Sequence, residues 1–150
     1  MSNRKEIVKE LTKSYWMEIE TVINYISNSI NLDGVRAEEI KKSLIIDIAE
    51  ELTHAQTLAK RIKELDGVIP GSMEFKPGQK SLQTLEDTTD VATVIEGVIE
   101  AEEGAIKQYN KIVKLCDGVD YVTQDLVIGL LAMEESHKRE FRGFLKEYKK

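Results

Sequence analysis

The two histidines of this chain each follow a glutamate by three positions. Glu51 precedes His54 in the segment EELTHAQTL, and Glu134 precedes His137 in the segment MEESHKRE. Three residues turn a helix by about 300°, so each glutamate and its histidine project from neighbouring points of one helix face. Carboxylate and imidazole groups together are typical ligands of iron, manganese or zinc. The spacing therefore predicts that both pairs bind metal.

The two halves of the chain repeat this pattern, and each half adds one earlier glutamate. Glu18 precedes Tyr25 by seven positions, as Glu102 precedes Tyr109. The distance from this earlier glutamate to the glutamate of the Glu-x-x-His pair is 33 residues in the first half and 32 in the second. If each half folds as a helical hairpin, four glutamates and two histidines meet at one level of the core.

Helices are predicted over most of the chain, because apolar residues recur at steps of three and four. The core-facing positions are Leu11, Tyr15, Glu18, Val22, Tyr25 and Ser29 in the first helix, Ile40, Leu44, Glu51, Leu58 and Ile62 in the second, Val91, Ile95, Val98, Glu102, Ala105, Tyr109 and Val113 in the third, and Val127, Leu130, Glu134, His137, Phe141, Phe144 and Tyr148 in the fourth.

The connections predict how the helices are joined. The first helix is expected to end in NLDG with Gly34 after its last turn, and the others are expected at 36–65, 90–117 and 121–148. Short links make antiparallel hairpins. Residues 68–90 are rich in Gly, Pro, Ser and Thr, which indicates a long crossover between the second and third helices. We therefore expect residues 1–150 to form one all-α domain, an antiparallel four-helix bundle.

The four glutamates of the repeat occupy core positions that otherwise hold apolar residues. An ionised carboxylate buried without a partner costs several kcal/mol, so four together require neutralisation. Their charge of −4 is balanced by two divalent cations, which predicts a two-metal site. We expect the other nearby carboxylates to face solvent because they fall off the core periodicity; these are Glu20, Glu50, Glu100, Glu103 and Glu135.

Composition excludes several other classes of function. The net charge of −6 without a basic stripe argues against a nucleic-acid partner. No apolar run approaches the ~18 residues of a membrane span, and the N-terminal segment has no signal-peptide core. Cys116 is the single cysteine, so an internal disulfide is excluded, and a reducing, cytoplasmic location is expected. Cys116 continues an apolar stripe and is expected to be buried.

The order Glu, Glu-x-x-His, Glu, Glu-x-x-His over four helices resembles the ferritin-like di-iron carboxylate proteins. The resemblance covers nearly the whole chain and is greatest to bacterioferritins, whose fourth helix is similar to DYVTQDLVIGLLAMEESH. It implies two irons per chain with Glu18 and Glu102 as terminal ligands, Glu51 and Glu134 as bridges, and His54 and His137 as caps. Tyr25 and Tyr109 are expected to form hydrogen bonds with the ligand glutamates.

The chain also departs from these families. The haem-ligating methionine of bacterioferritins would fall at Leu52, so no haem is expected. The chain ends 13 residues after His137, without the fifth helix of ferritins, and this favours a homo-oligomer that is a dimer over a 24-subunit cage. Rubrerythrins would place a glutamate at the position of Ala105 and would add a cysteine-rich module.

Six protein ligands leave two irons with open coordination positions, to which a small oxidant can bind. The resemblance implies oxidation of Fe(II) by O₂ or H₂O₂, which is a ferroxidase activity of the iron storage and detoxification type. Two alternatives stay open. One is a rubrerythrin-like peroxidase or oxygenase that uses an external electron donor, and the other is a non-catalytic bundle that binds manganese or zinc. In each case Glu51→Ala or His54→Ala is expected to abolish the two-metal site.

Overall fold

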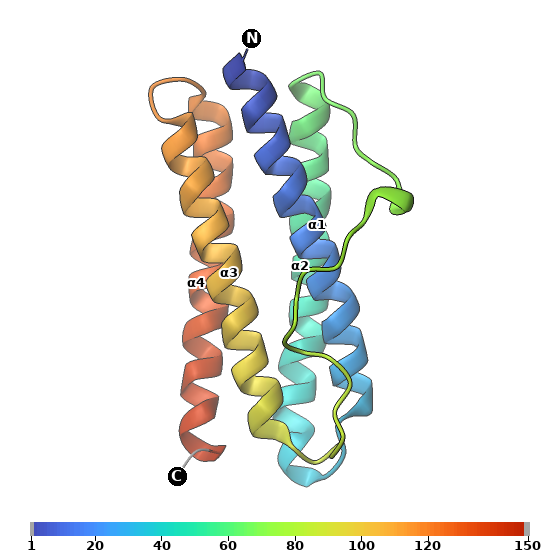
Figure 1. Cartoon of the computed structure of the whole chain (residues 1–150). Coiled ribbons are helices and arrows are strands. Elements are labelled where there is room, and N and C mark those ends of the chain that lie inside the picture. The colour runs from blue at the N-terminus through green and yellow to red at the C-terminus, as the bar shows by residue number, and fades with distance from the viewer. Residues whose placement is uncertain (1, 149–150) are drawn as a thin grey trace.

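Four long helices lie side by side in the computed structural model, which describes residues 2–148 (Figure 1). They are α1 (Ser2–Asn31), α2 (Glu38–Glu64), α3 (Val91–Cys116) and α4 (Tyr121–Tyr148), and two short 3-10 turns are η1 (Val35–Ala37) and η2 (Ser72–Glu74). No strand occurs within the described residues, so the all-α prediction is confirmed. No helix in residues 2–148 is long and apolar enough to cross a membrane.

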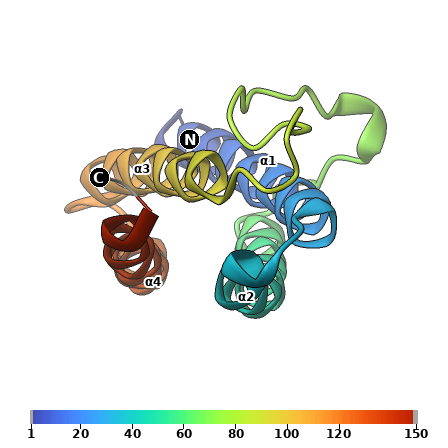
Figure 2. The same cartoon turned by 90° about the horizontal axis from the view of Figure 1, so that it is seen from below.

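The helices pair as two antiparallel hairpins, α1 with α2 and α3 with α4. The crossover between α2 and α3 returns along α1 from one end of the bundle to the other, as predicted (Figure 1). Between the hairpins, α1 contacts α3 more extensively than α2 contacts α4, and the end view shows this wider spacing (Figure 2). The side formed by α2 and α4 is therefore the more open side of the bundle.

The buried hydrophobic residues form two separate clusters. One contains Leu11, Leu58 and Cys116 from the end of the bundle where α1 begins, and the other contains Leu44 and Phe141 from the opposite end. The burial of Cys116 agrees with the prediction. The layer between the two clusters is filled by polar side chains, so the helices deliver the repeated glutamates and histidines to the middle of the core.

The helix ends follow local capping chemistry. Asp90 caps α3 by accepting a hydrogen bond from the backbone N–H of Thr93, and Asp120 accepts the N–H of Thr123 in the first turn of α4. Gly34 differs from expectation, because α1 already ends at Asn31. Gly34 instead precedes the turn η1 with a φ of 96°, a left-handed conformation that favours glycine.

Glu20 does not face solvent as expected, because the crossover covers this side of α1. Its carboxylate accepts hydrogen bonds from the backbone N–H groups of Gly78, at 2.9 Å, and Gln79, at 2.8 Å. The Asn24 amide on the same helix donates to the side-chain oxygen of Gln79 at 2.7 Å. These contacts attach the crossover to α1.

We expect Glu20→Ala to lower the free energy of unfolding by about 1–2 kcal/mol, since two backbone donors lose their acceptor. Urea denaturation measures the change. Glu100→Ala is the matched control, because Glu100 is an exposed carboxylate on α3, as predicted. Equal losses in the two variants would show that the crossover does not depend on Glu20.

Candidate metal centre

The polar layer contains every glutamate and histidine of the repeated pattern, and each is at most 8% exposed. Each of the four helices contributes: Glu18 from α1, Glu51 and His54 from α2, Glu102 from α3, and Glu134 and His137 from α4. The helical periodicity turns these positions inward, and the antiparallel hairpins set them at one level. The structure therefore brings together all six residues that the sequence singled out.

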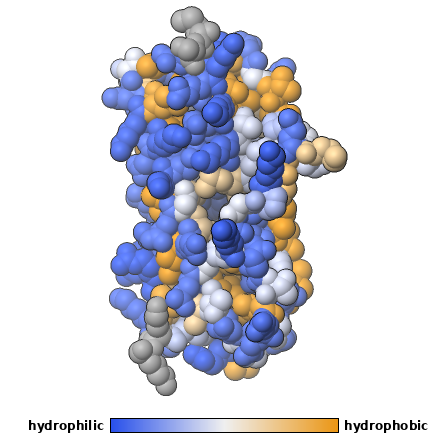
Figure 3. Space-filling view, in the orientation of Figure 1, coloured by the Kyte–Doolittle hydropathy of each residue, from blue (hydrophilic) through white to orange (hydrophobic). Residues whose placement is uncertain are grey.

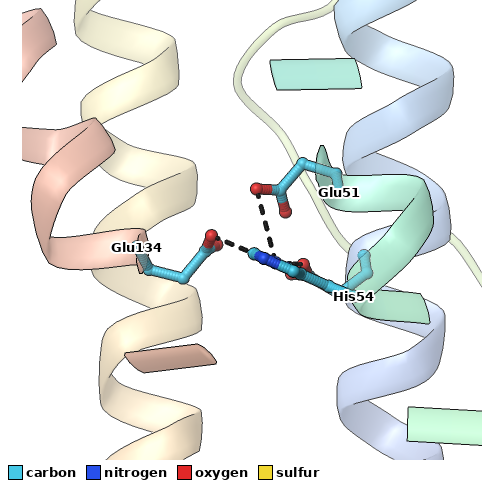
Figure 4. Close-up of side chains that lie close together, drawn as sticks. Glu51, His54 and Glu134 are labelled. Carbon is cyan, nitrogen blue, oxygen red and sulfur yellow. Dashed lines mark hydrogen bonds and ion pairs between the residues drawn. The ribbon is translucent and has the colours of Figure 1, made fainter. Parts of the chain in front are cut away.

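The first half of the site is centred on Nδ1 of His54. This nitrogen lies 3.0 Å from Glu18 Oε2, 3.4 Å from Glu134 Oε1 and 3.7 Å from Glu51 Oε1. Figure 4 shows Glu51 and His54 from α2 and Glu134 from α4 pointing toward one another. Ligand atoms of these four residues all lie within 4.8 Å of each other, a spacing that one metal ion can span.

The second half repeats this geometry around Nδ1 of His137. This nitrogen lies 3.4 Å from Glu51 Oε1, 3.4 Å from Glu134 Oε1 and 3.6 Å from Glu102 Oε2. Glu51 and Glu134 thus belong to both groups of possible ligands. Two adjacent cation positions that share two carboxylates follow from this arrangement.

Three carboxyl groups of the site resist ionisation while no cation is bound. Burial raises the pKa of Glu18, Glu51 and Glu134 well above the ordinary carboxyl value, and the charge of a neighbouring glutamate raises each further. Neither oxygen of Glu51 has a hydrogen-bond partner among the described residues. Buried, unpartnered carboxylate oxygens aimed at one another fit a cation pair.

The two histidines differ in their charge. Burial, together with the positive charge of His137, lowers the pKa of His54 to about 4, so His54 is neutral at pH 7. Burial also opposes the charged form of His137, but the nearby carboxyl groups of Glu102, Glu134 and Glu51 outweigh burial and raise its pKa far above the usual range. A neutral imidazole is the form that binds a metal, so His137 would have to release a proton to act as a ligand.

The two tyrosines of the repeat do not behave alike. The Tyr25 hydroxyl donates a hydrogen bond of 2.7 Å to Glu102 Oε1, as expected. The Tyr109 hydroxyl is buried and has no hydrogen-bond partner within residues 2–148, so the expected contact is not made there. Tyr25 therefore orients the carboxylate of Glu102, whereas Tyr109 forms no such hydrogen bond with a ligand glutamate.

Two acidic residues beside His137 were not predicted to take part. Glu50 is half-buried and contacts Nε2 of His137, so the expectation that Glu50 faces solvent is wrong. Asp47, which is 3% exposed, places Oδ1 3.5 Å from the same nitrogen. Burial raises the pKa of Asp47 to about 7. Asp47 and Glu50 are three positions apart on α2, a spacing that was the available signal in the sequence. Glu103 and Glu135 are exposed, as predicted.

The outer nitrogen of His54 has a different neighbour. Its Nε2 lies 3.2 Å from Sδ of Met133, which precedes Glu134 on α4. No feature of the sequence pattern marked Met133 as part of the site. The outer nitrogen of His137 thus faces carboxylates, whereas the outer nitrogen of His54 faces a thioether.

Comparison with known proteins shows the family of the chain. Residues 8–150 match the family described as the ferritin-like domain. The chain belongs to the ferritin-like family. This result confirms the resemblance read from the four-helix ligand pattern. A bacterioferritin of Desulfovibrio desulfuricans is 26% identical over 137 residues, which is 89% of this chain and 71% of the relative.

Solved structures show the same bundle. A ferritin-like di-iron carboxylate protein from Bacillus anthracis has a TM-score of 0.85 and 23% identity, with 97% of this chain and 99% of that chain covered. A dodecameric thioferritin from Bacteroides fragilis has a TM-score of 0.83 and 23% identity, with 97% and 87% covered. At this identity the likeness concerns the fold.

Proposed function

We propose that this protein binds two iron ions per chain and oxidises Fe(II) with O₂ or H₂O₂, as a ferroxidase of the iron storage and detoxification type. The observation that carries the proposal is the sharing of Glu51 and Glu134 by both groups of possible ligands. Shared carboxylates hold two metal ions close together, and a close pair supplies the two electrons that reduce a small oxidant. The family match and the bacterioferritin relative support the same chemistry.

Each residue has a defined task in this proposal. Glu18 and His54 would hold one iron, Glu102 and His137 would hold the other, and Glu51 and Glu134 would serve both. The hydrogen bond from Tyr25 keeps Glu102 oriented. Glu50 accepts the outer N–H of His137, and Asp47 Oδ1 lies 3.5 Å from the same nitrogen. These carboxylates orient the ring and would increase its basicity toward the metal.

Access is possible from the side of α2 and α4. A pocket of about 260 Å³ is lined there by residues of both helices, including Asp47, Glu50, Met133 and His137. The carboxylates of Asp47 and Glu50 at this pocket would attract Fe(II), and His137 is among the lining residues. Hydrophobic clusters lie on either side of the polar layer along the bundle axis, so water does not reach the layer from the two ends of the bundle.

Aerobic titration with Fe(II) tests the proposal. We expect an optical change in the near ultraviolet that stops at two Fe(II) per chain, with metal content confirmed by elemental analysis. Zinc or manganese binding without any oxidation of Fe(II) would instead support the non-catalytic bundle. If the protein completes repeated catalytic cycles only with H₂O₂ and an external electron donor, the peroxidase alternative would be favoured.

We also propose that the chain forms a homo-oligomer, with a dimer as the basic unit. Ile23, Ile26 and Ile30 are spaced on one face of α1 and are 49%, 43% and 73% exposed. Figure 3 shows hydrophobic side chains at the edge of the molecule beside the lower part of α1. On α2, Ile45 and Leu52 are exposed as well. A second copy would remove this apolar surface from water, and light scattering of the native protein measures the mass.

A further inference from the structure

The outer nitrogens of the two histidines contact the same position of the repeat. Glu50 immediately precedes the Glu-x-x-His pair of α2 and contacts Nε2 of His137 on α4. Met133 immediately precedes the pair of α4 and contacts Nε2 of His54 on α2, with Sδ at 3.2 Å. One repeat position therefore holds a carboxylate in the first half and a thioether in the second.

This difference changes the two histidines as donors. Nδ1 of His54 faces the glutamates, so when it binds a cation the ring proton lies on Nε2 and points at the sulfur of Met133. A thioether is a weak acceptor, whereas the carboxylate beside His137 is a strong one. Because a well-accepted outer N–H makes an imidazole ligand more basic, His54 is the weaker donor of the two.

Met133 is also placed where an oxidant can reach it. Met133 is 37% exposed and lines the pocket between α2 and α4, as His137 does. The sulfur contacts the buried His54 from a residue that solvent can reach. Methionine has three rotatable bonds, so the end of the side chain can turn without movement of α4.

We propose that Met133 is a site of peroxide oxidation and that its sulfoxide strengthens cation binding at the His54 position. One oxygen atom of H₂O₂ bonds to Sδ as the O–O bond breaks. The sulfur loses two electrons, and the second oxygen leaves with both hydrogens as water. The sulfoxide oxygen then accepts the Nε2–H of His54 in place of the weak thioether. The inference rests on the proposed function, which brings peroxide and iron to this pocket.

The first test compares Met133 with Met73 by peptide mass spectrometry after a limited dose of H₂O₂. Met73 is the matched control, because it is 97% exposed and lies on η2, away from the site. In metal-free protein, oxidation follows exposure and Met73 is expected to react first. In protein loaded with Fe(II), we expect Met133 to become the sulfoxide before Met73. Oxidation of Met73 ahead of Met133 in both samples would overturn the inference.

The same samples separate this inference from the proposed function. Fe(II) oxidation is followed optically during the reaction. Oxidised iron with an intact Met133 overturns the role of Met133 and leaves the ferroxidase proposal standing. Iron that stays Fe(II) overturns the ferroxidase proposal, and an intact Met133 in that same sample overturns the role of Met133 as well.

The second test measures the consequence for binding without any turnover. Cobalt(II) is titrated anaerobically into native protein, peroxide-treated protein freed of peroxide, and the variants Met133→Gln and Met133→Leu. The glutamine amide oxygen stands in for the sulfoxide oxygen. We expect the weaker of the two Co(II) sites to bind about tenfold more tightly in the oxidised protein and in Met133→Gln than in Met133→Leu. Equal affinities in all four samples would overturn the inference, and Met73→Gln controls for oxidation elsewhere.

Discussion

Glu51→Ala is expected to remove both bound metals, whereas His54→Ala is expected to remove only one. Glu51 belongs to both groups of possible ligands, and His54 belongs to the first group alone. Either change is expected to abolish two-electron reduction of the oxidant, because the oxidation of one Fe(II) to Fe(III) releases only one electron. For Glu51→Ala we expect at least a 100-fold loss of affinity at both positions, since changes even in the partners of ligands cost about 10–100-fold.

Equilibrium dialysis against Co(II) followed by elemental analysis measures the stoichiometry. Glu135→Gln is the matched control, because Glu135 is exposed and adjoins the site residue Glu134 in sequence. We expect the control to keep two metals per chain. Retention of two metals by Glu51→Ala would show that Glu51 does not bridge them, and a complete loss in His54→Ala would show that the two positions fill only together.

Raising the pH above 7 is expected to destabilise the metal-free protein and to widen its difference from the metal-bound protein. The pKa values of Glu18, Glu51 and Glu134 are raised by burial in the folded state, so the folded protein holds protons that the unfolded chain has released. His137, whose pKa is also raised, acts in the same direction. Stability contributed by these groups is therefore lost as pH rises through their folded pKa values.

His54 has the opposite sign but a different range. Its pKa is lowered to about 4, so it favours folding increasingly between that value and its unfolded pKa near 6.5. Above pH 7 the contribution of His54 to stability no longer changes. The stability of the metal-free protein then falls with pH because of the glutamates and His137. Bound cations replace the protons, so the metal-bound protein is expected to be nearly insensitive over pH 7–9.

Urea denaturation of metal-free and Co(II)-bound protein at pH 7, 8 and 9 measures this difference. Saturation at 100 times the dissociation constant stabilises the fold by about 2.7 kcal/mol per site. Glu51→Leu provides the control, because it removes a buried carboxyl group without a hydrogen-bond partner. We expect this variant to be more stable than native protein in the metal-free form at pH 8. Metal-free stability that increases from pH 7 to 9 would contradict the assignment of these protons.

The helical pattern predicted most of the fold for a simple reason. Heptad spacing reports which face of a helix is buried, and the positions on that face, such as Leu44, Val98 and Phe141, are fully buried in the structure. Gly and Pro residues between the helical segments indicated where the helices end. The start of α2 was less predictable, because η1 occupies the turn where a continuous helix was expected.

The candidate site was predictable because its residues lie on the same faces as the core. A carboxylate or an imidazole at a core position is conspicuous in a sequence, and the half-repeat set the two Glu-x-x-His pairs in register. Glu20, Glu50 and Met133 lie at the flanks of those faces instead. Periodicity places a flanking residue only relative to its own helix, so it does not reveal which neighbour the residue meets.

Four helices, their buried faces, and a set of four glutamates and two histidines at one level follow from the order of residues along the chain. The outer partners of the two histidines depend instead on how the helices pack. The spacing between α2 and α4 brought Glu50 to His137 and Met133 to His54. The path of the crossover similarly gave Glu20 its backbone partners. Such contacts depend on the distance and rotation between helices. Packing of the whole bundle determines both, so they cannot be inferred from one segment of the sequence.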